Sequence, residues 1–175
     1  MAALGTAEAI EIVGAVTVGV KWPNDLLIGE RKVGGILCES VASAASRPFQ
    51  VIGIGINVNG TREDFPDELR DIATTIRKEK GAFIDRNRLV ALTFNELESC
   101  LEEFLSGGRE PVALAYRRRC TTIGKTVKAL LADGKEWIGV AEAIEQDGSL
   151  TVAQRSGSAS PVVRQLRAAD IVHLR

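Results

Sequence analysis

Three short segments between positions 21 and 59 carry residue types that could bind a small anionic ligand. The first, Lys21-Trp22-Pro23-Asn24-Asp25, places a cation, a large aromatic ring, an amide and a carboxylate on one irregular turn. In the second, Lys32-Val33-Gly34-Gly35-Ile36-Leu37, a lysine enters a strand whose paired glycines have no side chains. The third, Gly-Ile-Gly-Ile-Asn-Val-Asn over 53–59, repeats glycine on alternate positions of one strand face. Such glycines allow a ligand or another backbone to approach closely.

Taken together, the three segments predict a pocket. Gly35, Gly53 and Gly55 would lie on adjacent strands and form a floor without side chains, with Lys32 at its rim. A flat, nearly neutral ligand could lie on this floor with its anionic group near the lysine. Each segment alone also has a structural interpretation, because a turn lysine is usually solvated, Trp22 could belong to the core, and strand glycines can mark bulges. The prediction therefore depends on the combination.

Other common chemistries find little support in the residues. A dinucleotide-binding G-x-G-x-x-G motif would need glycine where the chain has Val58, followed directly by a helix. Three distant cysteines and His173, the lone histidine, offer no spacing typical of a zinc site. Three scattered thiols are typical of a reducing compartment, so we predict a cytoplasmic protein.

The composition excludes further classes. The chain has 175 residues, 45% of them hydrophobic, and its 22 basic and 23 acidic residues leave a net charge of −1. This balance excludes a polybasic coat for nucleic acid or membranes, although it leaves local basic patches open. No apolar run approaches the roughly 20 residues that cross a bilayer, so we expect no membrane segment.

The hydrophobic pattern divides the chain into two regions. Met1–Ile12 reads as a helix, and Thr17–Asn57 as an antiparallel meander with a loop over Ala42–Ser46. Three helices are then expected: over Asp67–Lys78, from a cap at Asp85 to Gly107-Gly108, and from Pro111 to Arg119. The second of these has an apolar stripe formed by Val90, Phe94, Leu97, Leu101 and Phe104. From about Thr122, a period of two predicts five short strands with turns at Asp133-Gly134 and Asp147-Gly148 and a loop over Arg155–Ser160, typical of a small SH3-like barrel. We place the domain boundary between 1–121 and 122–175.

The run VKWPNDLLIGERKVGGIL, followed by VIGIGINVN, closely resembles the central domain of biotin–protein ligases, the class that includes bacterial biotin ligase/repressors. The match has three parts: KWPND, then the lysine of KxGGIL seven residues after the aspartate, then GIGIN. The order of the helices and the terminal barrel also match. The resemblance implies an α+β fold, with a mixed or antiparallel sheet and flanking helices like that of class II aminoacyl-tRNA synthetases and biotin ligases. In this chain that domain is incomplete at its N-terminus, and the barrel follows it.

The resemblance also implies a two-step reaction. Biotin and ATP would form biotinyl-5′-adenylate and pyrophosphate, and the biotinyl group would then pass to a lysine of a biotin carboxyl carrier protein. Mg²⁺ is implied by the use of ATP. Lipoate ligases are related in fold, but KWPND together with KxGGIL favours biotin.

The same resemblance assigns roles to individual residues. Lys32 corresponds to the lysine that contacts the reacting carboxylate and the α-phosphate, where a fixed cation can draw two anions together. Asp25 would position the acceptor lysine or a neighbouring side chain. The implied catalytic group is Lys32, Asp25 and Lys21. The implied biotin-binding group is Gly35, Gly53, Gly55 and Lys32, and the implied nucleotide-binding group is Asn57, Trp22 and Asn24.

The sequence departs from the family in what precedes these motifs. It contains no GRGRxGR-like loop, no preceding biotin-binding Ser/Thr and Gln segment, and no helix-turn-helix DNA-binding domain. We expect exposed apolar surface and an unpaired strand edge as a result. The chain would then either form a homodimer, through the sheet on the GIGIN side, or need a separate N-terminal ligase part. The alternatives to a complete ligase are a non-catalytic remnant that binds biotin, nucleotide or carrier, one subunit of a split ligase, and a structural module whose barrel docks a partner.

Overall fold

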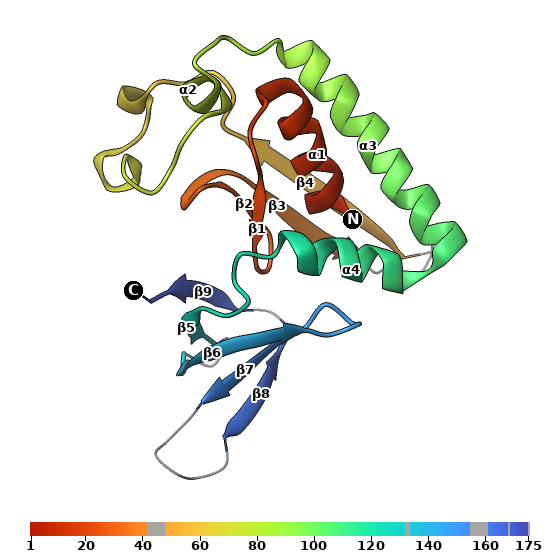
Figure 1. The fold of residues 1–175 in the computed structure, drawn as a ribbon, viewed down its shortest axis with the longest axis vertical. Coiled ribbons are helices and arrows are strands. Elements are labelled where there is room, and N and C mark those ends of the chain that lie inside the picture. Colours follow the sequence, from red (N-terminus) through yellow and green to blue (C-terminus); the bar gives the residue numbers. More distant parts are fainter. Residues whose placement is uncertain (42–47, 132–133, 155–160, 168, 175) are drawn as a thin grey trace. The chain divides into compact units, whose positions relative to one another are not determined.

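The computed structural model describes residues 1–41, 48–131, 134–154, 161–167 and 169–174, and the statements below refer to these residues. They fall into two units, Met1–Gly19 with Asn24–Glu102, and Val20–Pro23 with Glu103–Arg175. Each unit combines helices with a β-sheet, so the predicted α+β class is confirmed (Figure 1). The domain boundary that the sequence predicts after residue 121 lies inside the second unit.

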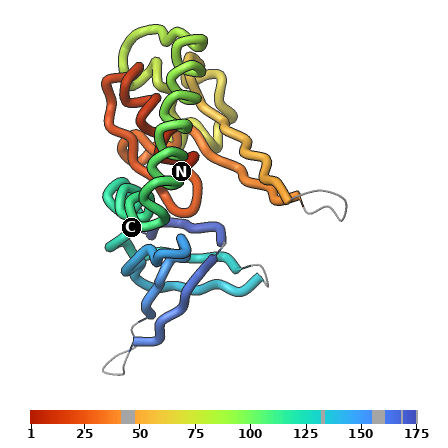
Figure 2. Tube along the Cα trace, turned by 90° about the vertical axis from the view of Figure 1, so that its right-hand side faces the viewer, coloured from red at the N-terminus to blue at the C-terminus, as the bar shows by residue number. Residues whose placement is uncertain are grey.

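The sheet of the first unit is the meander that the sequence predicts over Thr17–Asn57. Its strands lie in the order in which they occur along the chain: β1 (Gly19–Lys21), of which only Gly19 is grouped with the first unit, β2 (Asp25–Ile28), β3 (Arg31–Val41) and β4 (Phe49–Ile56). β3 pairs antiparallel with both β2 and β4. Figure 2 shows β3 and β4, in orange, extending together as a long ribbon away from the helices of this unit. The loop expected over Ala42–Ser46 lies outside the described residues.

Three helices complete the first unit: α1 (Ala2–Gly14), α2 (Ile76–Lys80) and α3 (Arg86–Gly107), whose residues from Glu103 on are grouped with the second unit. α1 is buried along most of its length, and Gly5 brings it against the α3 backbone, because a Cβ added at Gly5 would lie 2.9 Å from the carbonyl carbon of Glu96. Asp85 caps α3 as predicted, since its carboxylate accepts hydrogen bonds from the backbone N–H groups of Asn87 and Arg88.

The apolar stripe predicted on α3 is not the face that the helix buries. Val90 and Phe94 are 54% and 68% exposed, whereas Leu89, Thr93 and Cys100 are buried. The buried face therefore lies one residue away from the stripe that the sequence pattern indicates. Val90 and Phe94 therefore belong to the exposed apolar surface of the chain.

The helix predicted over Asp67–Lys78 is wrong. Residues 67–69 form only a 3-10 turn, and α2 begins at Ile76. Thr75 is extended, and its hydroxyl caps α2 by accepting a hydrogen bond from Lys78 N. Ile72 and Thr74, which precede Thr75, form backbone hydrogen bonds with Lys32 in β3 instead of continuing a helical turn. These tertiary hydrogen bonds outweigh the local helical pattern.

The second unit contains α4 (Arg109–Arg119) and the strands that the period of two predicts. These are β5 (Thr126–Leu130), β6 (Glu136–Ile144), β7 (Leu150–Gln154), β8 (Val162–Leu166) and β9 (Asp170–His173), in the order β8-β7-β6-β5-β9. All of the pairings between them are antiparallel. Closure into an SH3-like barrel stays a prediction. Gly148 has the positive φ expected of the turn predicted there, while Asp133 and the loop over Arg155–Ser160 lie outside the described residues.

Within the described ranges, no helix combines the length and the apolar character needed to cross a membrane.

Candidate functional site

A β-bulge in β3 decides which way Lys32 points. Asp25 pairs with Gly35 and Leu26 with Gly34, but Leu27 pairs with Lys32, so Val33 is an extra residue in the ladder. Paired residues of neighbouring strands share a face, and residues two apart in one strand also share a face. The bulge therefore brings Lys32 to the same face as Asp25 and Gly35. Without it, an odd separation would place Lys32 and Gly35 on opposite faces.

On this face, Lys32 and Asp25 form an ion pair above Gly35. The distance from Lys32 Nζ to Asp25 Oδ1 is 2.5 Å. A Cβ added at Gly35 would lie 3.3 Å from Lys32 Cε and 3.6 Å from Asp25 Oδ1, so the missing side chain provides the room for the pair. The lysine side chain is 48% exposed. An ion pair in which the lysine is this exposed to water contributes about 1 kcal/mol or less to stability. An anionic ligand can therefore compete with Asp25 for the lysine.

The ion pair borders a pocket of about 460 Å³. Its lining consists of Asn24, Asp25, Lys32, Gly35, Ile36, Leu37, Gly53, Ile54 and Gly55. Gly35 pairs with Gly55, and Leu37 pairs with Gly53, so the three glycines lie on one face of two adjacent strands. The structure thus brings together the glycine floor and the rim lysine that the sequence predicts.

Two asparagines of the predicted nucleotide-binding group lie near Lys32 in different ways. Asn24 lines the pocket and is bound to β3 at both ends: its Nδ2 donates to Ile36 O at 2.6 Å, and its own carbonyl accepts from Ile36 N at 2.9 Å. These bonds fix the turn that presents Asp25. Asn57 follows β4, where its backbone N–H donates to Val33 O at 2.8 Å. It is not among the lining residues.

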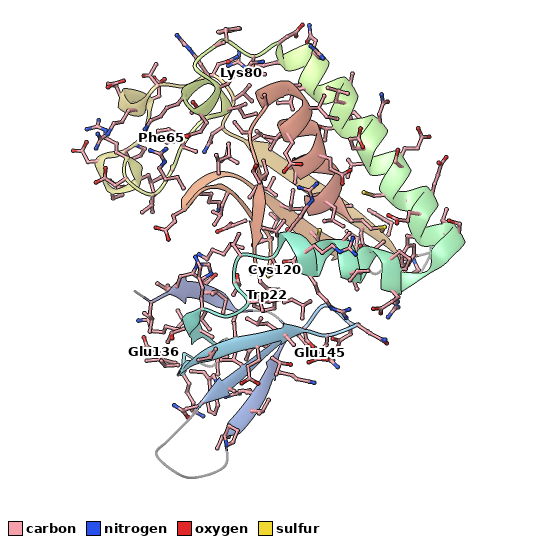
Figure 3. The ribbon with its side chains drawn as sticks, in the orientation of Figure 1. Trp22, Phe65, Lys80, Cys120, Glu136 and Glu145 are labelled. Atoms are coloured by element: carbon pink, nitrogen blue, oxygen red, sulfur yellow. The ribbon has the colours of Figure 1, made fainter. Side chains whose placement is uncertain are left out.

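Lys21 and Trp22 are grouped with the second unit, and their predicted roles stay predictions. Trp22 is 2% exposed and packs in the core of that unit (Figure 3). Its indole Nε1 donates to Gly148 O at 2.9 Å, and its backbone N–H donates to Thr122 Oγ1 at 3.0 Å. The ring therefore offers no exposed face for a nucleotide base, and its placement favours the core interpretation.

Sequence reasoning missed a segment that contacts the backbone of Lys32. The N–H of Lys32 donates to Ile72 O, and the carbonyl of Lys32 accepts from Thr74 N, both at 2.8 Å. Ala73 and Thr74 are buried. The available signal was the pair Thr74-Thr75 before a buried isoleucine, since threonine favours extended backbone and helix N-caps over helix interiors. The helix predicted over Asp67–Lys78 includes both threonines, so this signal was not used.

No group of three or more His, Cys, Asp or Glu side chains gathers into a metal-binding cluster in the part of the chain that the structure describes.

Comparison with known proteins agrees with the motifs. Residues 1–59 match the Biotin/lipoate A/B protein ligase family. The "Bifunctional ligase/repressor BirA" of Bacillus spizizenii is 33% identical over 171 residues, which are 98% of this chain and 51% of that protein. The "Biotin--[acetyl-CoA-carboxylase] ligase" of Mycobacterium tuberculosis is 33% identical over 175 residues, covering all of this chain and 60% of that protein.

The fold agrees with these matches. The structure of the biotin protein ligase from Aquifex aeolicus in complex with biotin and ATP superposes with a TM-score of 0.80, at 24% identity over 99% of this chain and 69% of that one. Over nearly all of its own length the chain is thus similar to biotin–protein ligases, as its motifs indicate. It spans about half the length of the curated relatives described above.

Proposed function

We propose that this chain carries the ligase chemistry of its relatives: ATP-dependent formation of biotinyl-5′-AMP, followed by transfer of the biotinyl group to a lysine of a biotin carboxyl carrier protein. The observation that carries the proposal is the half-exposed ammonium of Lys32 at the rim of a glycine-floored pocket. The relatives named above are ligases, and the Aquifex aeolicus enzyme binds biotin and ATP in its structure, which supports this choice.

In the first step, a carboxylate oxygen of biotin attacks the α-phosphorus of ATP. An O–P bond forms, the bond to the β-phosphate bridge breaks, and pyrophosphate leaves with the electron pair. Two anions must approach each other for this reaction, so a fixed cation between them lowers the barrier. Lys32 is the residue assigned to this task. It acts as an electrostatic group and does not form a covalent bond.

In the second step, the ε-amine of the carrier lysine attacks the carbonyl carbon of the adenylate. The new amide C–N bond forms, the bond to AMP breaks, and the amine loses a proton. In the ligand-free chain, Asp25 is paired with Lys32, which supports the interpretation that it positions a neighbouring side chain. A role for Asp25 in orienting the acceptor amine stays part of the proposal.

The glycine floor suits the bicyclic ring of biotin. The pocket volume of about 460 Å³ lies in the range of small-molecule sites, roughly 300–1,000 Å³. Gly53 and Gly55 leave the strand surface bare, so a flat ring can contact the backbone while its carboxylate chain reaches towards Lys32. Asn24 and Asn57, near the lysine, remain the proposed contacts for the nucleotide. Mg²⁺ would accompany the phosphates of ATP, and no residue of the chain is assigned to it.

The edge of the first sheet is the proposed site of assembly. β4 is the last strand in the sheet order, and its eight residues, FQVIGIGI, carry no charge. Phe49, Val51 and Ile52 are each about half exposed. Uncharged edge strands of this kind pair readily with another strand. We propose that this edge receives either a second copy of the chain or a separate N-terminal ligase part, which sedimentation with and without such a part would distinguish. A cytoplasmic location and the lack of a DNA-binding domain stay predictions from the sequence.

The alternatives that the sequence leaves open are a non-catalytic remnant that binds biotin, nucleotide or carrier, and one subunit of a split ligase. The deciding experiment incubates a carrier domain with this chain, ATP, Mg²⁺ and biotin and follows the carrier mass. Lys32→Ala is the test variant, and Lys78→Ala, which removes an exposed lysine of α2, is its matched control.

A biotin-sized mass gain that needs Lys32 but not Lys78 supports the ligase. If no gain occurs, but adding an N-terminal ligase fragment restores it, the chain is one part of a split enzyme. If the folded chain neither biotinylates the carrier nor responds to the fragment, yet still binds biotin or its adenylate, the remnant is correct.

A further inference from the structure

Both backbone polar groups of Lys32 are held by one segment that the ligase mechanism above does not use. The N–H of Lys32 donates to Ile72 O, and the carbonyl of Lys32 accepts from Thr74 N. Ala73, between these two residues, therefore lies beside Lys32 in a parallel bridge. The segment is anchored in turn: Thr74 is fully buried, and the backbone N–H of Ile76 donates to Asn57 O at 3.0 Å. The Cα of Lys32 is thus held by residues about 40 positions later in the chain.

A single carboxylate oxygen ties this arrangement together. Glu79, on α2, uses Oε1 to accept a hydrogen bond from Thr74 Oγ1 and an ion-paired hydrogen bond from Arg31 at 2.7 Å. Arg31 directly precedes Lys32, and the N–H of Thr74 bonds to the carbonyl of Lys32. The Glu79 side chain is only 17% exposed, so these bonds are partly shielded from water. Glu79 therefore connects α2 to the two residues that precede the bulge, to Arg31 directly and to Lys32 through Thr74.

We propose that Glu79 and Thr74 are positioning residues, which act through Lys32 and set where its ammonium lies. This inference rests on the proposed function. The half-exposed side chain of Lys32 extends from this held backbone to the pocket rim, so a shift of the backbone moves the point from which Nζ reaches the rim. Misplacing a reacting group by about 1 Å can slow a reaction on the order of 100-fold, so a loosened backbone at Lys32 has a large effect on rate.

The test uses the full chain and measures biotinyl-5′-AMP formed from biotin and MgATP. Glu79→Gln and Thr74→Val should each slow adenylate formation about 10-fold, while Thr74→Ser, which keeps the hydroxyl, should stay within about twofold of wild type. The matched control is Asp71→Asn, which removes an exposed ion pair with Arg62 in the same region and should leave the rate unchanged. Urea unfolding confirms that each variant is folded under assay conditions.

A double-mutant cycle separates positioning from a general loss of structure. In a Lys32→Ala background, Glu79→Gln should add less than about twofold, because the group through which it acts is already gone. A further loss as large as that in the wild-type background would overturn the proposal.

A second readout does not depend on activity. The ¹³Cε signal of Lys32 in the ligand-free chain, assigned with Lys32→Arg, should move in Glu79→Gln and Thr74→Val, but not in Thr74→Ser or Asp71→Asn. If wild type forms no adenylate but the signal moves in this pattern, positioning holds and the proposed function fails. If wild type forms adenylate, and Glu79→Gln changes neither the rate nor the signal, the function stands and the positioning role is wrong.

Discussion

Gly35 lies directly beneath the side chain of Lys32, with 3.3 Å between Lys32 Cε and the place that a Cβ of residue 35 would occupy. At that distance the lysine or the backbone must move by a few tenths of an ångström to admit a methyl group. The glycine is therefore part of what places the ammonium. Gly55, its neighbour across the ladder, has no such restriction, because a Cβ there would meet nothing nearer than Gly35 O at 3.9 Å.

We accordingly expect Gly35→Ala and Gly55→Ala to fail in different ways. Gly35→Ala should disturb Lys32 before any ligand binds, slowing adenylate formation about 10-fold or more. Gly55→Ala should leave the ligand-free lysine in place and weaken biotin binding by occupying the floor. Isothermal titration with biotin and the ¹³Cε signal of Lys32 report the two effects separately. Identical behaviour of the two variants would show that Gly35 has no particular relation to the lysine.

Trp22→Phe distinguishes a core residue from a nucleotide contact. The phenyl ring keeps most of the packing in the second unit but removes the indole N–H that donates to Gly148 O. The cost should be about 1 kcal/mol in the free energy of unfolding, with ATP affinity unchanged. Urea unfolding and nucleotide titration measure both quantities. A large loss of ATP affinity in a variant of near-normal stability would restore the nucleotide-binding role that the sequence predicts.

Gly5→Ala tests the contact between α1 and α3. In an unrestricted helix this change stabilises by about 0.4–1 kcal/mol. Here the added methyl would meet the backbone of Glu96 and Leu97 at 2.9 Å, which neither residue can avoid by rotating a side chain. Overpacking of this kind should destabilise by about 1–3 kcal/mol. The sign of the change in a urea or thermal melt decides the matter, since a gain in stability would mean that the helices are not in close contact at this position.

The carboxyl group of Asp147 makes the stability of the second unit depend on pH. Hydrogen bonds from Ser149 Oγ at 2.6 Å and from Ser149 N at 3.0 Å lower the pKa of the Asp147 carboxyl below its usual value of 3.8. Because the folded state has the lower pKa, the carboxylate stabilises the fold above the unfolded pKa, and this contribution is lost as the pH falls through the folded pKa. Asp147→Ala should be less stable than wild type at neutral pH, and the difference should shrink on acidification. A difference that is constant with pH, in unfolding measured by urea, would contradict this assignment.

The sequence predicted those features of the fold that depend on local pattern. Alternating apolar residues and turn glycines identified the strands, and Asp85 identified the start of α3, because each signal acts over a few neighbouring positions. The glycine floor was predictable for the same reason: Gly53 and Gly55 share a face by simple alternation.

What the sequence could not predict depends on contacts between distant residues. Lys32 faces the pocket only because Val33 is an extra residue in the ladder, and no pattern within β3 reveals which residue is extra. Thr74 leaves the helical pattern because it bonds to Lys32, and Trp22 belongs to a core built mostly from residues more than 100 positions later. In each case tertiary hydrogen bonds or packing outweigh local propensity.

The bulge at Val33 means that the direction of the key cation is set by the pairing register of β2 and β3 as well as by side-chain chemistry. Substituting Val33 by another residue leaves Lys32 three positions before Gly35, so a scan of substitutions would pass over this feature. Deleting Val33 would place Lys32 two positions before Gly35 with unbroken alternation, and the ammonium would stay on the same side of the sheet without a bulge. Keeping Val33 but pairing it regularly would instead turn the ammonium to the opposite side, so a change of register here could keep every motif and still remove the working pocket.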